Sequence, residues 1–156
     1  MKVSVITICD RVSRDGDPDE WGPEIEAVLR TGLPDLEIAR RVVPEDPYAI
    51  RAALEESADS EYVLTAGGTG IGAREVAPEV TAAYCDRLLP GIAEAIRGAS
   101  MHETPLAMLI RSTAGMKGTA IIVNLPGSVQ GARLSTRLLL PIMPHTPAMI
   151  RGRPAG

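Results

Sequence analysis

The sequence predicts an α/β fold with a mainly parallel sheet covered by helices on both faces. Segments rich in β-branched residues alternate along the chain with segments of helical periodicity. Residues 3–9 are apolar on both faces, as expected for a strand in a covered sheet. Several strand-like segments also run directly into turns rich in glycine or proline. This alternation is typical of parallel sheets, because each crossover between parallel strands contains a helix.

The first 32 residues predict a strand, a loop and a helix. Residues 3–9 are β-branched and form the strand, and the polar residues 10–19 form the loop. A helix begins near Trp21, because Pro23 is favoured in a first helical turn. Gly32 ends that helix.

The next 34 residues predict a strand, a helix and a second strand. Residues 36–43 alternate imperfectly between apolar and polar, so we place this strand nearer the edge of the sheet. Asp46 is an expected N-cap, Pro47 follows it, and the helix continues to about residue 58. Residues 62–66 form a short strand that enters a glycine-rich turn.

The remaining chain predicts further helices and one strand. Helices are expected after Pro78, at residues 91–100 and, as a short turn, at residues 105–110. Residues 119–124 form a strand. Residues 130–151 are mostly helical, with interruptions at three prolines.

Composition narrows the functions that the chain can have. Its 156 residues, with 45% apolar side chains, suit one domain, which we expect at residues 1–152 with a flexible tail at 153–156. The net charge of −4, the absence of Phe and the single Trp argue against a nucleic-acid partner. No apolar run reaches the roughly 20 residues of a membrane span. Two separate cysteines suit reduced thiols, and we expect a cytoplasmic protein.

Three strand exits carry the candidate functional residues, at 9–11, 66–70 and 124–128. Ligands of open parallel sheets bind outside the carboxyl ends of the strands, so these exits are expected to form a single cleft. Because the protein is acidic, an anionic, phosphate-bearing ligand must be held locally, by backbone amides, helix N-termini or a bound cation.

The first candidate is the glycine turn of Gly67, Gly68, Thr69 and Gly70. Glycines leave backbone N–H groups accessible to a phosphate and allow positive φ, and the threonine adds a hydroxyl donor. A tight turn without a ligand explains the residues equally well. The turn is neither a Walker A loop nor a complete dinucleotide-binding fingerprint, which would need glycine in place of Ala73.

The second candidate turn and three carboxylates complete the set. The turn contains Asn124, Pro126, Gly127 and Ser128. Ser128 can offer an anion site at the start of the next helix, although a simple N-cap is the stronger interpretation from the residues alone. The carboxylates, which suit Mg²⁺ held together with substrate phosphates, are Glu45, Asp46 and Glu75. Solvated loop charges are the alternative, and it is favoured when the carboxylates are considered alone.

In their order along the chain, these motifs resemble the MogA/MoaB family of molybdenum-cofactor biosynthesis proteins, which is related to a domain of gephyrin. The resemblance covers nearly the whole chain and rests chiefly on two turns of specific separation, Thr65-Ala66-Gly67-Gly68-Thr69-Gly70 and Asn124-Leu125-Pro126-Gly127-Ser128. Further matching segments are Cys9-Asp10-Arg11, Val43-Pro44, Ala73-Arg74-Glu75-Val76-Ala77-Pro78 and Pro144-His145.

The resemblance implies a three-layer α/β/α domain that assembles as a homotrimer or, in some cases, a hexamer. The implied substrate is molybdopterin, a pterin dithiolene with a terminal phosphate. The implied reaction uses Mg²⁺ and ATP to place AMP on that phosphate with release of pyrophosphate. Metal is later inserted into this product, so the molybdenum-insertion enzyme of the pathway is an expected partner.

The resemblance also implies the roles of individual residues. The implied ligand-binding residues are Asp10, Gly67, Gly68, Thr69, Gly70, Asn124, Pro126, Gly127 and Ser128. Two aspartates that serve adenylyl transfer in the family correspond to Glu45 and Glu75, and the neighbouring Asp46 can replace the first. Each glutamate keeps the charge on a longer side chain. The implied function is molybdopterin adenylyltransferase; the alternatives are a binding or delivery protein without efficient transfer and, last, an oligomeric scaffold.

Overall fold

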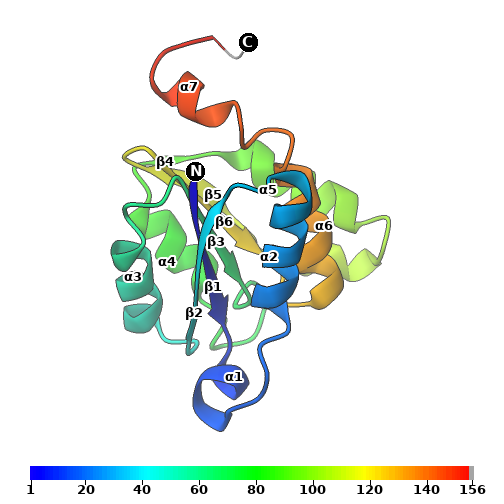
Figure 1. Cartoon of the computed structure of the whole chain (residues 1–156). Coiled ribbons are helices and arrows are strands. Elements are labelled where there is room, and N and C mark those ends of the chain that lie inside the picture. Colours follow the sequence, from blue (N-terminus) through cyan, green and yellow to red (C-terminus); the bar gives the residue numbers. More distant parts are fainter. Residues whose placement is uncertain (155–156) are drawn as a thin grey trace.

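The structure is a computed structural model that describes residues 1–154, in which a mixed six-stranded sheet lies between two layers of helices (Figure 1). The predicted α/β fold is confirmed. The elements in chain order are β1 (Lys2–Ile8), α1 (Asp10–Asp15), α2 (Trp21–Gly32), β2 (Glu37–Val43), α3 (Pro47–Glu56), β3 (Tyr62–Ala66), α4 (Ala77–Tyr84), β4 (Arg87–Leu88), α5 (Pro90–Ser100), the 3₁₀ helix η1 (Pro105–Leu109), β5 (Ala114–Lys117), β6 (Ala120–Leu125), α6 (Val129–Leu139) and α7 (Thr146–Ile150).

The strand order is β2-β1-β3-β6-β5-β4. The strands β2, β1, β3 and β6 are parallel, whereas β5 pairs antiparallel with β6 and with β4. The register pairs Thr7 with Ala66 and Ala66 with Leu125, so three strands end at the same level of the sheet. The three strand exits that carry the candidate residues therefore begin side by side.

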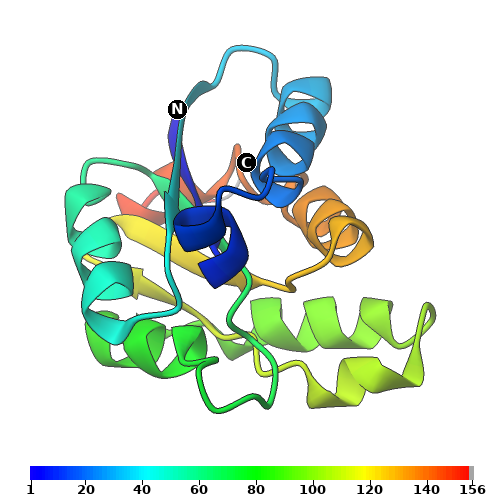
Figure 2. The same ribbon diagram turned by 90° about the horizontal axis from the view of Figure 1, so that it is seen from below.

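Two hydrophobic cores hold the three layers together. One core packs α2, α5 and α6 on the sheet through buried residues that include Ile25, Ile96 and Leu139. The other packs α3 and α4 on the opposite face through residues that include Leu54 and Tyr84. Figures 1 and 2 show the two helical layers on either side of the sheet. Both faces of β1, β3 and β6 are consequently buried, which explains their continuous apolar sequences.

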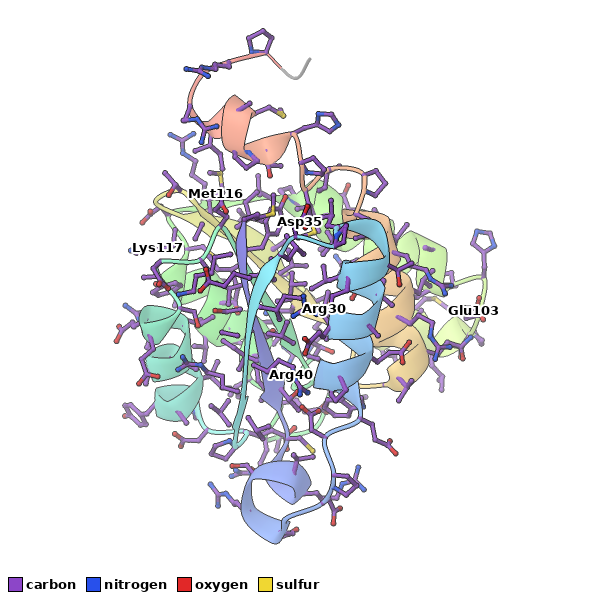
Figure 3. The ribbon with its side chains drawn as sticks, viewed as in Figure 1. Arg30, Asp35, Arg40, Glu103, Met116 and Lys117 are labelled. Carbon is purple, nitrogen blue, oxygen red and sulfur yellow. The ribbon has the colours of Figure 1, made fainter. Side chains whose placement is uncertain are left out.

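The edge position predicted for the second strand is confirmed, and ion pairs explain its arginines. Glu26 of α2 binds Arg30 of the same helix and Arg40 of β2, each with a nitrogen–oxygen distance of 2.9 Å. Figure 3 shows Arg30 and Arg40 on these two neighbouring elements. Charged side chains also protect an edge strand from pairing with another chain.

The prediction of a polar loop at residues 10–19 is wrong for its first part, because Asp10–Asp15 forms α1. Cys9 provides an extended N-cap, Asp10 places a negative charge in the first turn, and Gly16 ends the helix at φ 77°. None of the α1 residues is buried. An apolar stripe, the main signal of a helix in a sequence, is therefore missing.

Two short antiparallel strands, β4 and β5, were also missed. The β5 strand contains Ala and Gly, which have low β-propensity, and β4 has only two residues. A loop of Gly118 and Thr119 joins β5 to β6, and Gly118 adopts the positive φ of 57° that such a tight hairpin requires. Figure 3 shows Met116 and Lys117, the last two residues of β5 in this hairpin, away from α2.

The last helix, α7, lies at the end of the molecule opposite α1 (Figure 1). It is tied to the sheet by a 2.8 Å hydrogen bond between the hydroxyls of Tyr62 and Thr146. No helix within residues 1–154 has both the length and the apolar character needed to cross a membrane. Residues 155–156 of the expected tail lie outside the described residues.

Candidate functional site at the carboxyl edge of the sheet

The predicted site residues come together at the carboxyl ends of the parallel strands. Figure 2 views the molecule from this side. Gly67 follows β3 and Gly127 follows β6, and a β-carbon on Gly127 would lie 3.1 Å from the Gly67 Cα. Trp21 packs against both turns. These two strand exits therefore lie side by side, as expected from a parallel sheet.

Glycine is required at the start of the first turn. Gly67 has φ 99°, and a β-carbon there would lie 2.3 Å from the carbonyl oxygen of Ile8. Gly68 has φ 68°, and its β-carbon would lie 3.1 Å from that of Ala77. A side chain at Gly67 would therefore collide with backbone that cannot move independently, in a conformation that L-residues rarely adopt.

The amides of the first turn already bind an anion, which is the carboxylate of Glu75. Its Oε1 accepts from the Gly70 N–H at 3.0 Å, and its Oε2 accepts from the Gly72 N–H at 2.8 Å. The Gly67 N–H donates to the Leu125 carbonyl at 3.2 Å. Among residues 1–154, the N–H groups of Gly68, Thr69 and Ile71 have no acceptor. These amides are the backbone donors of the turn that remain for a ligand.

The second turn has a structural cap and a buried amide. The Ser128 hydroxyl accepts from the Gly131 N–H at 3.0 Å and so caps α6. Asn124 is fully buried; its Nδ2 donates to the hydroxyls of Thr65 and Thr81, and its Oδ1 accepts from the Thr113 N–H. Both Asn124 amide protons are thereby used, and this side chain ties β6 to β3 and α4.

A small recess of about 80 Å³ adjoins the second turn. It is bordered by Pro126 and Ser128 of the turn, by Ser100 at the end of α5, and by Ile110. The Ser100 hydroxyl is buried and has no hydrogen-bond partner within the described residues. Glu103 lies at the outer side of this region, beyond α5 (Figure 3). An unpaired buried hydroxyl is costly, so it indicates a position where a polar ligand atom can bind.

Asp10 forms a pair with Arg74, which lies 64 residues away in the sequence. Arg74 Nε donates to Asp10 Oδ2 at 2.7 Å, and Arg74 Nη2 donates to Oδ1 at 3.1 Å. The Glu45 N–H also donates to Oδ1, at 2.9 Å. The Arg74 hydrogen bonds outweigh the effect of burial and lower the pKa of Asp10 to about 2.

The two carboxylates after β2 have different surroundings. Burial raises the pKa of Glu45, and the negative charges of Asp10 and Glu75 raise it further, while Arg74 partly offsets them. Asp46 instead caps α3, because its Oδ2 accepts from the Ala49 N–H at 2.8 Å. The structure therefore brings Glu45 toward Asp10 and Glu75 and gives Asp46 the capping role predicted from the sequence.

Sequence reasoning missed the arginines that organise this site. Arg74 pairs with Asp10, and Arg111 hydrogen-bonds to the glycine turn through Thr69 and Gly70. Arg74 stands inside a matched motif, which is the one signal that pointed to it. Arg111 lies 41 residues from Gly70, and nothing in the local sequence indicates their contact.

We expect replacement of Arg74 by Gln to raise the pKa of Asp10 from about 2 toward its ordinary 3.8. A pKa that is lower in the folded state stabilises the protein above the unfolded pKa of about 3.9, and this stabilisation is lost as the pH falls through the folded value. The wild type and Arg74→Gln should therefore differ in stability near neutral pH and converge in acid. Carboxyl NMR titration and urea unfolding between about pH 2 and 6 measure both effects.

Arg14 provides the matched control for this prediction. It also contacts Asp10, but at the longer distance of 3.6 Å, and it contributes least to the lowered pKa. Arg14→Gln should therefore change the Asp10 pKa less than Arg74→Gln does. Equal shifts in the two variants would contradict the assigned pairing.

The fold and these contacts define a class of protein, an open α/β domain with glycine-rich turns at the carboxyl ends of its parallel strands, which is where such domains bind their ligands. The family model that matches the chain covers residues 4–145 and is described as "Probable molybdopterin binding domain". The chain belongs to this family, and the resemblance inferred from its motifs is confirmed.

Curated relatives and solved structures support the same family membership. The chain is 34% identical to "Gephyrin" of Dictyostelium discoideum over 97% of its length, and 35% identical to "Molybdopterin adenylyltransferase" of Haemophilus influenzae over 81%. It spans 23% of that gephyrin and 66% of that transferase. The chain is also 32% identical to a "Molybdopterin adenylyltransferase" of Helicobacter pylori, and it spans 88% of the length of that protein. The structure of "Molybdopterin biosynthesis enzyme MoaB" from Thermus thermophilus matches with a TM-score of 0.88, at 37% identity over 99% of both chains.

Proposed function

We propose that the protein is a molybdopterin adenylyltransferase. In this reaction a terminal phosphate oxygen of molybdopterin attacks the α-phosphorus of ATP. The new bond joins AMP to molybdopterin, and the bond between the α-phosphorus and the leaving pyrophosphate breaks. The relatives that carry this activity in their names support the proposal, as does a site in which binding donors and carboxylates lie around one glycine turn. The alternative of a non-catalytic binding protein is not favoured by these relatives.

The observation that carries the proposal is the arrangement of groups around the glycine turn. Glu75 binds the turn at Gly70 and Gly72, and its charge is close enough to raise the pKa of Glu45. The recess with the unpaired Ser100 hydroxyl adjoins the neighbouring turn through Pro126. We assign the recess to one polar edge of the pterin and the carboxylates Glu45 and Glu75 to the nucleotide phosphates, with the free amides of the glycine turn between them.

The carboxylates fit the requirements of Mg²⁺. Within residues 1–154 no group of three or more His, Cys, Asp or Glu side chains could hold a metal ion. Mg²⁺ is usually bound by one or two carboxylates together with substrate phosphates, and we propose that Glu45 and Glu75 are these carboxylates. Each Glu75 oxygen accepts one amide and keeps a second lone pair; burial, and after it the negative charges of Asp10 and Glu75, raises the pKa of Glu45.

We therefore assign the metal to Glu45 and Glu75, and we leave Asp46 as the cap of α3. When bound, Mg²⁺ would neutralise charge that develops on pyrophosphate. The protein itself orients the two carboxylates: Arg74 neutralises Asp10, which in turn fixes the Glu45 backbone, and the glycine turn fixes Glu75. Asp10 is thus a residue that shapes the site.

The direct test incubates the purified protein with molybdopterin and Mg-ATP. We expect stoichiometric formation of adenylylated molybdopterin and pyrophosphate, with neither product in the presence of a chelator. Quenching of Trp21 fluorescence gives an independent measure of binding, because this single tryptophan packs against both site turns. Binding of molybdopterin without release of pyrophosphate would overturn the transferase assignment.

We also propose that the protein forms a homotrimer through an apolar groove of about 460 Å³ between α5 and the end of α6. Leu138 and Ile142 line this groove and are each 37% exposed, whereas Leu139 is buried in the chain's own core. Neighbouring leucines at the end of α6 are thus divided between core and surface. Association would cover the apolar groove.

Leu138→Glu tests the assembly. We expect it to yield monomers in sedimentation velocity at micromolar concentration, because a charge in a buried apolar contact opposes association. Leu106→Glu is the matched control, since Leu106 is 69% exposed and lies in η1, outside the groove. A wild-type monomer, or a Leu138→Glu variant that assembles like the wild type, would exclude this groove as the interface.

The cellular setting follows from the same assignment. Cys9 and Cys85 are free thiols, as suits the reducing cytoplasm. We propose that the protein acts there and that its adenylylated product passes to a molybdenum-insertion enzyme. Co-purification with such an enzyme in the presence of molybdopterin and ATP would support this partnership.

A further inference from the structure

The segment at residues 110–112 links the two parts of the site. Ile110 borders the recess, and its carbonyl accepts from Arg97 Nη1 of α5 at 3.3 Å. The same nitrogen donates to the Ser112 carbonyl at 2.8 Å. Arg97 therefore fixes this short segment on both sides of Arg111 and leaves the Arg111 side chain to face the glycine turn.

Arg111 binds three carbonyl groups of the glycine turn and the chain that follows it. Its backbone N–H donates to the Thr69 carbonyl at 2.8 Å, and its Nε donates to the Gly70 carbonyl at 2.8 Å. Its Nη2 donates to the carbonyl of Glu75 at 2.6 Å. A fourth contact is an ion pair between Nη1 and Glu79.

These contacts complement those of the Glu75 side chain. The Glu75 carboxylate closes the turn from its amide side, by accepting from Gly70 and Gly72. Arg111 closes it from the carbonyl side, at Gly70 and at Glu75 itself. The planar guanidinium holds its donors in a fixed fork, which an ammonium group does not reproduce.

We propose that Arg111 is a positioning residue that fixes the Glu75 carboxylate relative to the substrate bound at the recess; this inference rests on the proposed function. Residues 110 and 111 are adjacent, and Arg97 holds the carbonyls on both sides of Arg111, which couples the wall of the recess to the residue that holds the chain at Glu75. Displacement of a reacting or charge-stabilising group by about an ångström costs on the order of a hundredfold in rate. The role requires no contact between Arg111 and substrate.

The experiment compares Arg111→Lys and Arg111→Met with Glu79→Gln. We expect Arg111→Lys to lower kcat about 10- to 100-fold, and Arg111→Met at least as much, with the KM for molybdopterin unchanged within about twofold. Glu79→Gln removes only the exposed ion pair and should keep kcat within about twofold of the wild type. If Arg111 had a purely structural role, its variants would have a lower melting temperature but would not combine a lowered kcat with an unchanged KM.

Hydrogen exchange of the Gly70 and Gly72 amides provides a readout that does not depend on activity. Both amides should exchange faster in Arg111→Lys, because the turn that presents them to Glu75 is loosened, and Glu79→Gln should leave them protected. If Arg111→Met does not fold, the kcat and the amide exchange of Arg111→Lys and Glu79→Gln decide whether Arg111 positions Glu75.

The two proposals fail in different ways. A wild-type protein that releases no pyrophosphate contradicts the transferase assignment, and amide exchange still tests the contact of Arg111 with the turn. An active wild type together with an Arg111→Lys variant of normal kcat and normal amide exchange overturns the positioning role.

Discussion

Glu75→Gln should reduce adenylyl transfer by about 10²- to 10³-fold while molybdopterin affinity changes by less than about threefold. The substitution removes the charge that we assign to Mg²⁺. It also replaces one of the two oxygens that accept the amides of Gly70 and Gly72 with an NH₂ donor. Pyrophosphate release measures transfer, and Trp21 fluorescence measures binding.

Glu75→Asp separates the charge from the reach of the side chain. A carboxylate one methylene shorter cannot span the same two amides without a shift of the turn, so we expect Glu75→Asp to be less active than the wild type. Glu79→Gln controls for the loss of a negative charge nearby, since Glu79 pairs only with Arg111 in the described structure. Full magnesium-dependent activity of Glu75→Gln would remove the metal from this residue.

Gly67→Ala should destabilise the folded protein by about 3–5 kcal/mol, which is at the upper end for a single substitution. The new β-carbon would lie 2.3 Å from the Ile8 carbonyl oxygen and 2.7 Å from the Trp21 ring, at φ 99°. The turn cannot retreat from Ile8, because the Gly67 N–H is bonded to Leu125 on the other side. Urea unfolding measures the free energy, and the change in Trp21 fluorescence follows the transition.

Gly118→Ala is the matched control for this prediction. Gly118 also has a positive φ, of 57°, but apart from its chain neighbours no atom lies within 4 Å of the position that a β-carbon would take there. It should therefore lose only the backbone preference of glycine, about 1 kcal/mol. Equal losses in Gly67→Ala and Gly118→Ala would show that the close approach of the first turn to β1 is not what requires glycine.

Local sequence determined most of the elements of this protein. The strands at residues 62–66 and near 119–124, the capping role of Asp46 and the turn after Pro105 were all predicted from neighbouring residues, and the structure confirms them. These signals are strong because burial, capping and turn formation depend on side chains only a few positions apart. The exposed helix α1 and the short strand β4 were missed, since neither carries a buried stripe.

The tertiary structure alone decided how the site residues act. It paired Asp10 with Arg74 and Arg111 with Gly70, across 64 and 41 residues. It also buried Asn124 among Thr65, Thr81 and Thr113, where its amide joins β3, α4 and the segment before β5. The sequence determined which residues carry charge and which turns need glycine; packing of the parallel strands determined which of those groups meet, because their carboxyl ends converge only once the sheet has formed.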